Sequence, residues 1–107
     1  MVGRASFTVV GADPAREIAQ GGVFQVGERG VLRFEAPLSP RPSEQHWVTV
    51  VRAGSADSDW GEWYYVETGA VSTSVDFHST GAFEVRLHDG YPRLAHHVIL
   101  RRHVEVR

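Results

Sequence analysis

The clearest periodic stretch of the chain reads Ala82-Phe83-Glu84-Val85-Arg86-Leu87-His88. Every second residue from Phe83 to Leu87 is apolar, and the residues between them are charged or ionisable. Successive side chains of a β-strand point to opposite faces of a sheet, so this alternation predicts a strand with one buried face and one solvated face. We therefore expect Arg86 and His88 to lie on the exposed face.

Short runs of similar character lie on both sides of this stretch, separated by Gly, Pro, Asp and Ser. The predicted strands are residues 6–10, 23–26, 30–36, 46–52, 62–67, 70–77, 82–88 and 95–106. A turn is predicted at Asp89-Gly90-Tyr91-Pro92. The last strand is unusually long, and its pattern breaks near Arg101-Arg102, which predicts a bulge or a bend there.

Helical periodicity is almost absent. The best candidate is residues 13–19, because Asp13 before Pro14 is a good helix start, but Gly21-Gly22 would end such a helix within two turns. We expect at most one short helical turn. About seven or eight strands, several with one polar face, favour antiparallel pairing in a two-sheet sandwich. A small closed barrel is the alternative, and residues 1–107 are expected to form one domain.

Composition excludes several classes of function. The 107 residues carry a formal net charge of -2, and all 11 positive side chains are Arg, so a nucleic-acid partner is not expected. There is no cysteine, which excludes disulfides and Cys-ligated zinc. The first residues lack the apolar segment of a signal peptide, and no stretch approaches about 18 apolar residues, so neither a signal peptide nor a membrane span is expected. A chain of net negative charge without a basic patch argues against a membrane partner. We expect a cytoplasmic protein, and the Arg-only usage suggests a GC-rich bacterial genome.

Residues 79–85, Ser-Thr-Gly-Ala-Phe-Glu-Val, resemble the turn into strand F of immunoglobulin-like domains. Phe83 stands at the aromatic position of that turn, and Val85 stands where a core cysteine is often found. Phe34 precedes Trp47 by a spacing similar to that between the core residue of strand B and the tryptophan of strand C. The resemblance implies an immunoglobulin-like sandwich. Its core would include Phe34, Trp47, Phe83, Val85 and Leu87.

A narrower resemblance concerns SKICH domains, which are immunoglobulin-like modules that target proteins to membranes or partners. Residues 46–51, His-Trp-Val-Thr-Val-Val, look like the Asp-Trp-Ile-Gly-Ile-Phe segment of that family, with departures at His46 and Thr49. Trp63-Tyr64-Tyr65 and the strand from Phe83 to Leu87 follow in a similar order. The resemblance implies an interaction module and nothing more specific.

Six histidines raise the question of a metal site. His88 and His96 flank the predicted turn, with Asp89 nearby, and a hairpin could bring them close. Zinc needs three or four convergent ligands, whereas the adjacent His96 and His97 would point to opposite faces of a strand. We therefore expect ordinary solvated or half-buried histidines, and no metal or cofactor.

The sequence shows no catalytic motif. Asp76, His78 and Ser79 are close in sequence, but no serine lies in a Gly-x-Ser-x-Gly turn. The polar loop that contains Asp57 and Asp59 lacks the EF-hand pattern. We expect that the protein is not an enzyme.

The aromatic cluster between residues 60 and 65 is the strongest indication of function. Trp63 and Tyr65 would share one face of their strand, and Tyr64 would share the other, so only one set can enter the core. The outer rings either pack across strands on the solvated face or form a binding surface, with Arg86 and His88 as a polar rim.

The leading hypothesis is a non-catalytic protein-interaction or assembly module of a bacterial multi-protein system. The alternative is a β-sandwich that binds a carbohydrate or another small ligand. Strand edges, the first and last strands above all, could also pair two copies of the chain. The candidate binding residues are Trp60, Trp63, Tyr64, Tyr65, Arg86 and His88.

Overall fold

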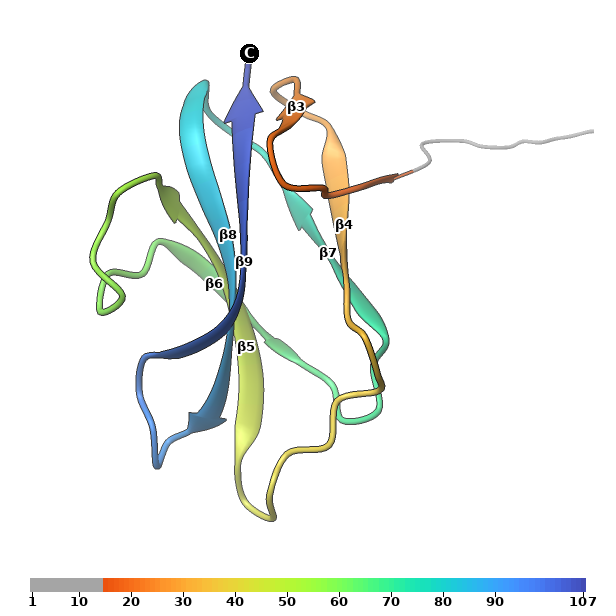
Figure 1. The fold of residues 1–107 in the computed structure, drawn as a ribbon, viewed down its shortest axis with the longest axis vertical. Helices are drawn as coiled ribbons and strands as arrows, with labels where there is room; N and C mark the ends of the chain where they lie inside the picture. The colour runs from red at the N-terminus through yellow and green to blue at the C-terminus, as the bar shows by residue number, and fades with distance from the viewer. Residues whose placement is uncertain (1–14) are drawn as a thin grey trace, which may run out of the picture.

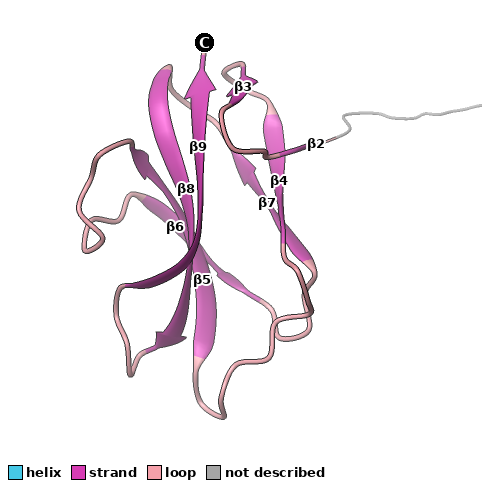
Figure 2. Ribbon diagram, viewed as in Figure 1, coloured by secondary structure: helices cyan, strands magenta, loops and turns pink. Residues whose placement is uncertain are grey.

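The computed structural model describes residues 15–107. This part of the chain contains strands and no helix (Figure 2). The strands are β2 (Arg16–Glu17), β3 (Gly22–Phe24), β4 (Arg29–Arg33), β5 (Gln45–Arg52), β6 (Glu62–Val66), β7 (Ser72–Asp76), β8 (Gly81–Tyr91) and β9 (His97–Val106). They form two sheets, as expected for an all-β sandwich (Figure 1).

The larger sheet has the strand order β3-β9-β8-β5-β6, and the smaller sheet has the order β2-β4-β7. Neighbouring long strands pair in the antiparallel direction, as predicted from their polar faces. Two short strands depart from this rule, because β2 is parallel to β4 and β3 is parallel to β9. The last strand, β9, lies between β3 and β8 over Val104–Val106, so the expectation that it forms a sheet edge is wrong for this part of the strand.

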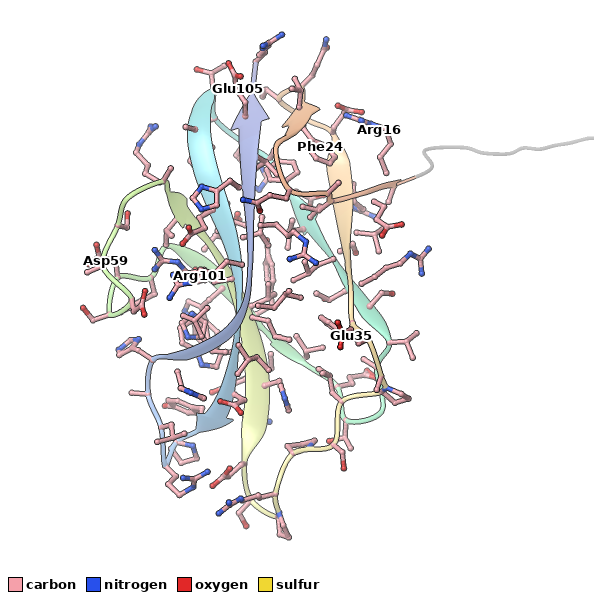
Figure 3. The ribbon with its side chains drawn as sticks, in the orientation of Figure 1. Arg16, Phe24, Glu35, Asp59, Arg101 and Glu105 are labelled. Carbon is pink, nitrogen blue, oxygen red and sulfur yellow. The ribbon has the colours of Figure 1, made fainter. Side chains whose placement is uncertain are left out.

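The core lies between the two sheets, where apolar side chains from both layers meet. Phe24 and Phe77 pack there with ring centroids 4.7 Å apart. In Figure 3, Phe24 points into the space between β9 and β4. The buried cluster consists of Ile18, Phe24, Leu32, Leu38, Val48, Val66, Val75, Phe77, Val85, Leu87, Val104 and Val106. The inward face predicted for the stretch from Phe83 to Leu87 is thus confirmed.

Several predicted boundaries need correction. β4 ends at Arg33, so Ala36 is an exposed residue before Pro37 instead of an inward-facing strand residue. β8 continues to Tyr91, through most of the predicted turn. Leu87 pairs with Leu100 but His88 pairs with Val98, so the bulge of β9 is at Ile99 and not at Arg101-Arg102.

At the N-terminal end, Arg16–Glu17 is a short strand, and no helical turn forms over residues 15–19. The strand predicted at residues 6–10 and the start of the predicted helical turn lie outside the described residues.

Candidate functional site

The outer face of the larger sheet, which points away from the core, carries the candidate site. Val48 of β5 enters the core, so its neighbours Trp47 and Thr49 point outward. The register of the sheet places Trp47 between Tyr65 of β6 and His88 of β8. Three strands thus bring outward-facing side chains from distant parts of the sequence together.

These side chains surround a pocket of about 270 Å³. Its lining comes from β5, β6, the end of β8, the loop between β5 and β6, and the turn between β8 and β9. The lining residues are Trp47, Trp60, Trp63, Tyr65, Tyr91, Ala95 and His96. We call this the aromatic pocket. All three tryptophans of the chain line it.

The rings of the aromatic pocket stand at steep angles to one another. Trp63 and Tyr65 are 5.1 Å apart with 77° between their planes, and Tyr65 and Tyr91 are 6.2 Å apart at 48°. Large parts of the rings remain exposed, from 38% for Tyr91 to 60% for Trp60. The rings therefore form the walls of a concave site and not a flat platform.

Trp47 forms the floor of the aromatic pocket and is only 6% exposed. Its ring stacks on the fully buried ring of His88, and the ring of His96 meets both of them edge-on. Four buried ring nitrogens here have no hydrogen-bond partner within residues 15–107. They are Trp47 Nε1, His88 Nδ1, His88 Nε2 and His96 Nδ1. Burial, together with the neighbouring His96 and Arg86, lowers the pKa of His88 to about 4, so the ring is neutral at pH 7.

A buried arginine holds the loop between β5 and β6 against the sheet. Arg86, which is 1% exposed, donates hydrogen bonds to the carbonyl oxygens of Ser55 and Ala56 at 2.5 and 2.7 Å. Its Nε also donates to the carboxylate of Glu84. Burial disfavours ionised Glu84, but its hydrogen bond and ion pair with Arg86 outweigh burial and keep the pKa of Glu84 below its usual value.

Two side chains of β9, Arg101 and His103, complete this cluster around Glu84. Arg101 bridges Glu84 and Asp57, at 3.2 and 2.8 Å, and His103 Nε2 is 2.8 Å from Glu84. Figure 3 shows Arg101 on the same side of the sheet as Asp59 of the loop, away from the smaller sheet. The cluster therefore fastens the loop that carries Trp60 to the outer face of the sheet.

The loop also needs a glycine where it enters β6. Gly61 donates its N–H to Thr49 Oγ1 at 3.2 Å, and Thr49 Oγ1 donates to the carbonyl of Glu62 at 2.8 Å. A Cβ atom on residue 61 would lie 2.8 Å from the carbonyl oxygen of Val50. Only glycine, which has no Cβ, allows the backbone between Trp60 and Trp63 to pass this close to Val50.

The structure brings together three of the six predicted site residues, Trp60, Trp63 and Tyr65. Tyr64 is separate, because it packs against the core from the other face of β6. The expectation that Arg86 and His88 form an exposed rim was wrong, because both are buried. The alternating polar residues Glu84, Arg86 and His88 predict a solvated face, whereas in the structure the loop between β5 and β6 and the ring of Trp47 cover this face of β8.

Sequence reasoning missed Trp47, Tyr91, Ala95 and His96 as lining residues. Trp47 was assigned to the core between the sheets, but it lies on the opposite face of β5 from Val48. Trp47 lies two residues before the polar Thr49 and therefore shares its face of the strand, and this spacing is a signal in the sequence that Trp47 faces away from the core. Tyr91 carries no such signal, because only the pairing of β8 with β5 places it beside Trp47. For His96 the sequence indicated that a hairpin could bring it close to His88, and the two ring centroids are 6.3 Å apart.

No group of three His, Asp or Glu side chains within residues 15–107 is placed to hold a metal ion. Asp76, His78 and Ser79 line a smaller pocket of about 110 Å³, where His78 pairs with Glu62 at 3.2 Å. No helix in this part of the chain is long and apolar enough to cross a membrane.

No protein-family model matches the chain, and no curated protein matches it significantly. Function must therefore be inferred from the residues of the aromatic pocket.

Proposed function

We propose that the protein is a non-catalytic interaction module that captures a group of a protein partner in the aromatic pocket. The observation that carries this proposal is the exposure of Trp60, Trp63, Tyr65 and Tyr91 around one concavity. Large aromatic side chains dominate binding hot spots, and concave apolar sites are the usual places where ligands bind. The charged cluster around Arg86 supports the same role, because it holds one wall of the pocket in place before binding.

The proposal includes the immunoglobulin-like character of the sandwich, which the resemblance of residues 79–85 supports. Trp47 does not contribute to that resemblance, because the strand C tryptophan of immunoglobulin domains packs between the sheets. The absence of cysteine and of lysine supports a cytoplasmic role in a bacterial multi-protein assembly.

A displayed library of random peptides would test the protein-binding role. We expect the wild-type domain to enrich a set of peptides from the library. These peptides should bind the double variant Trp63→Ala/Tyr65→Ala at least about tenfold more weakly than they bind the wild type. Val71→Ala, which changes a residue that is 53% exposed and does not line the pocket, should bind the peptides like the wild type. Peptides that bind the folded double variant equally well would show that the pocket is not the binding surface.

Carbohydrate binding is the second candidate, since exposed aromatic rings line the pocket and such rings can stack on sugar faces. A glycan array probed with the same variants tests this candidate. A glycan that binds the wild type and Val71→Ala, but not Trp63→Ala/Tyr65→Ala, would favour it over a protein partner.

A further inference from the structure

We propose that the aromatic pocket binds a quaternary ammonium group, that is, a nitrogen with four carbon substituents and a permanent positive charge. This inference rests on the proposed function, because it names the chemical group that the pocket captures. A protein partner could present such a group as trimethylated lysine, and a small solute could present it as choline.

The arrangement of the rings is the first argument. Trp47 and Trp63 are 6.4 Å apart at 83°, and Trp63 and Tyr65 are nearly perpendicular as well. Rings at such angles surround a compact, roughly spherical group from several sides. A sugar ring stacks best on a flat platform, which these angles do not provide.

The electrostatics of aromatic rings are the second argument. The face of an aromatic ring is negative and attracts cations, most strongly in tryptophan. Elsewhere in the molecule, the chain uses its own arginines for this purpose: Arg16 lies 4.4 Å over the ring of Phe24, and Arg52 lies 5.1 Å over the ring of Phe83. Within residues 15–107, no guanidinium lies over a ring of the aromatic pocket.

The lack of an anionic acceptor is the third argument. The nitrogens Trp47 Nε1 and His96 Nδ1 are buried, and no carboxylate lines the pocket. A primary ammonium is strongly hydrated and binds best where a carboxylate accepts its N–H groups, which this pocket does not provide. A quaternary ammonium group has no N–H to satisfy, so the pocket favours it over a primary ammonium.

The volume of the pocket agrees with a compact group. About 270 Å³ lies just below the range of roughly 300–1,000 Å³ that is typical of sites for drug-sized ligands. The pocket would therefore enclose the ammonium end of a ligand, while the rest of the ligand lies against the exposed ring of Trp60 or in solvent.

The indole N–H signals of the protein give a direct test by NMR. The chain has only three tryptophans and all of them line the pocket, so these three signals report on it specifically. Choline should shift the indole signals saturably, with a dissociation constant roughly tenfold lower than that of 3,3-dimethyl-1-butanol, its uncharged isostere. Trp60→Ala and Trp63→Ala should each weaken choline binding at least about fivefold, and Val71→Ala should not.

Two peptides separate the possible sources of the group. A peptide with Nε-trimethyllysine that binds more tightly than free choline, while its unmethylated form does not bind, would support a protein partner. Binding of choline alone would support a small solute, and either result supports the ammonium inference.

The inference is wrong if the uncharged isostere binds as tightly as choline, or if choline leaves the indole signals unchanged. Selected peptides or glycans that still shift those signals would preserve the proposed function in that case. If neither they nor choline shift the signals of the folded protein, both proposals are wrong.

Discussion

The indole of Trp47 stacks on the imidazole of His88, with ring centroids 3.8 Å apart and only 7° between the planes. One ring comes from β5 and the other from β8, and the two residues are direct neighbours in the sheet register. The stack forms the floor of the aromatic pocket and buries an imidazole without a hydrogen-bond partner in residues 15–107. Both the stability of the domain and the shape of the pocket should therefore depend on this pair.

The buried His88 should make stability depend on pH. Its pKa is about 4 in the folded protein, against about 6.5 for an ordinary histidine, so the unfolded chain binds a proton more readily than the folded one. The contribution of His88 to stability is complete above pH of about 6.5 and falls until about pH 4, by at most on the order of 3 kcal/mol. His88→Phe removes the ionisable ring and should therefore remove this pH dependence from the free energy of unfolding, as measured by urea unfolding at several pH values. Identical pH slopes for the two proteins would contradict a neutral, buried His88.

Trp47 and Trp63 should differ in their effect on stability, although both line the pocket. Trp47→Ala removes a ring that is 6% exposed and should lower the free energy of unfolding by about 3–5 kcal/mol. Trp63→Ala removes a ring that is 42% exposed and should cost only about 1 kcal/mol. Urea unfolding of both variants tests this difference. Equal losses would mean that Trp63 belongs to the folding core and is not a free wall of the binding site.

Replacement of Arg86 should destabilise the domain and release the loop. Arg86→Met leaves two backbone carbonyls without their donor, while Glu84 keeps Arg101 and His103, so we expect a loss of about 3 kcal/mol. The indole N–H signal of Trp60 should also move towards its random-coil position.

A double-mutant cycle with Glu84→Gln gives the coupling between the two buried charges. We expect the double variant to lose less stability than the sum of the single variants. Arg33→Met serves as the surface control, since Arg33 pairs with Glu17 in solvent, and it should change stability by no more than about 0.5 kcal/mol. Strict additivity of the Glu84 and Arg86 variants would show that the two buried charges do not stabilise the fold as a pair.

Gly61→Ala should disturb the pocket through the backbone. The new Cβ would lie 2.8 Å from the carbonyl oxygen of Val50, which cannot move without disturbing the pairing of β5 with its neighbours. We expect a loss of about 1–3 kcal/mol and altered indole signals for both Trp60 and Trp63. Ser58→Ala, an exposed change in the same loop, is the matched control and should leave both measurements unchanged. A Gly61→Ala variant with wild-type spectra would show that the loop can shift freely.

Local sequence patterns predicted most strands and the inward residues of β8. The alternation of Phe83, Val85 and Leu87 is a property of neighbouring residues, and a strand puts such residues on one face whatever surrounds it. Residues 60–65 likewise showed that Trp63 and Tyr65 share a face, although they did not show which face is buried.

The second face of β8 could not be predicted in the same way. Glu84, Arg86 and His88 are polar at every second position, and such a pattern normally marks a solvated face. Here their cover is supplied by residues about 30 positions away, through hydrogen bonds from Arg86 to Ser55 and Ala56. Buried charges are stable only when partners meet them in space, and those partners are not visible in a local pattern.

The sequence by itself determined the all-β class, the absence of cysteine chemistry and the grouping of aromatic residues on β6, because each depends on composition or on neighbouring residues. The tertiary structure decided that Trp47 faces outward, that His88 and Arg86 are buried, and that Tyr91 and His96 join the pocket. The physical reason is that a pocket is formed by strand register and loop placement, which depend on contacts between residues far apart in the chain.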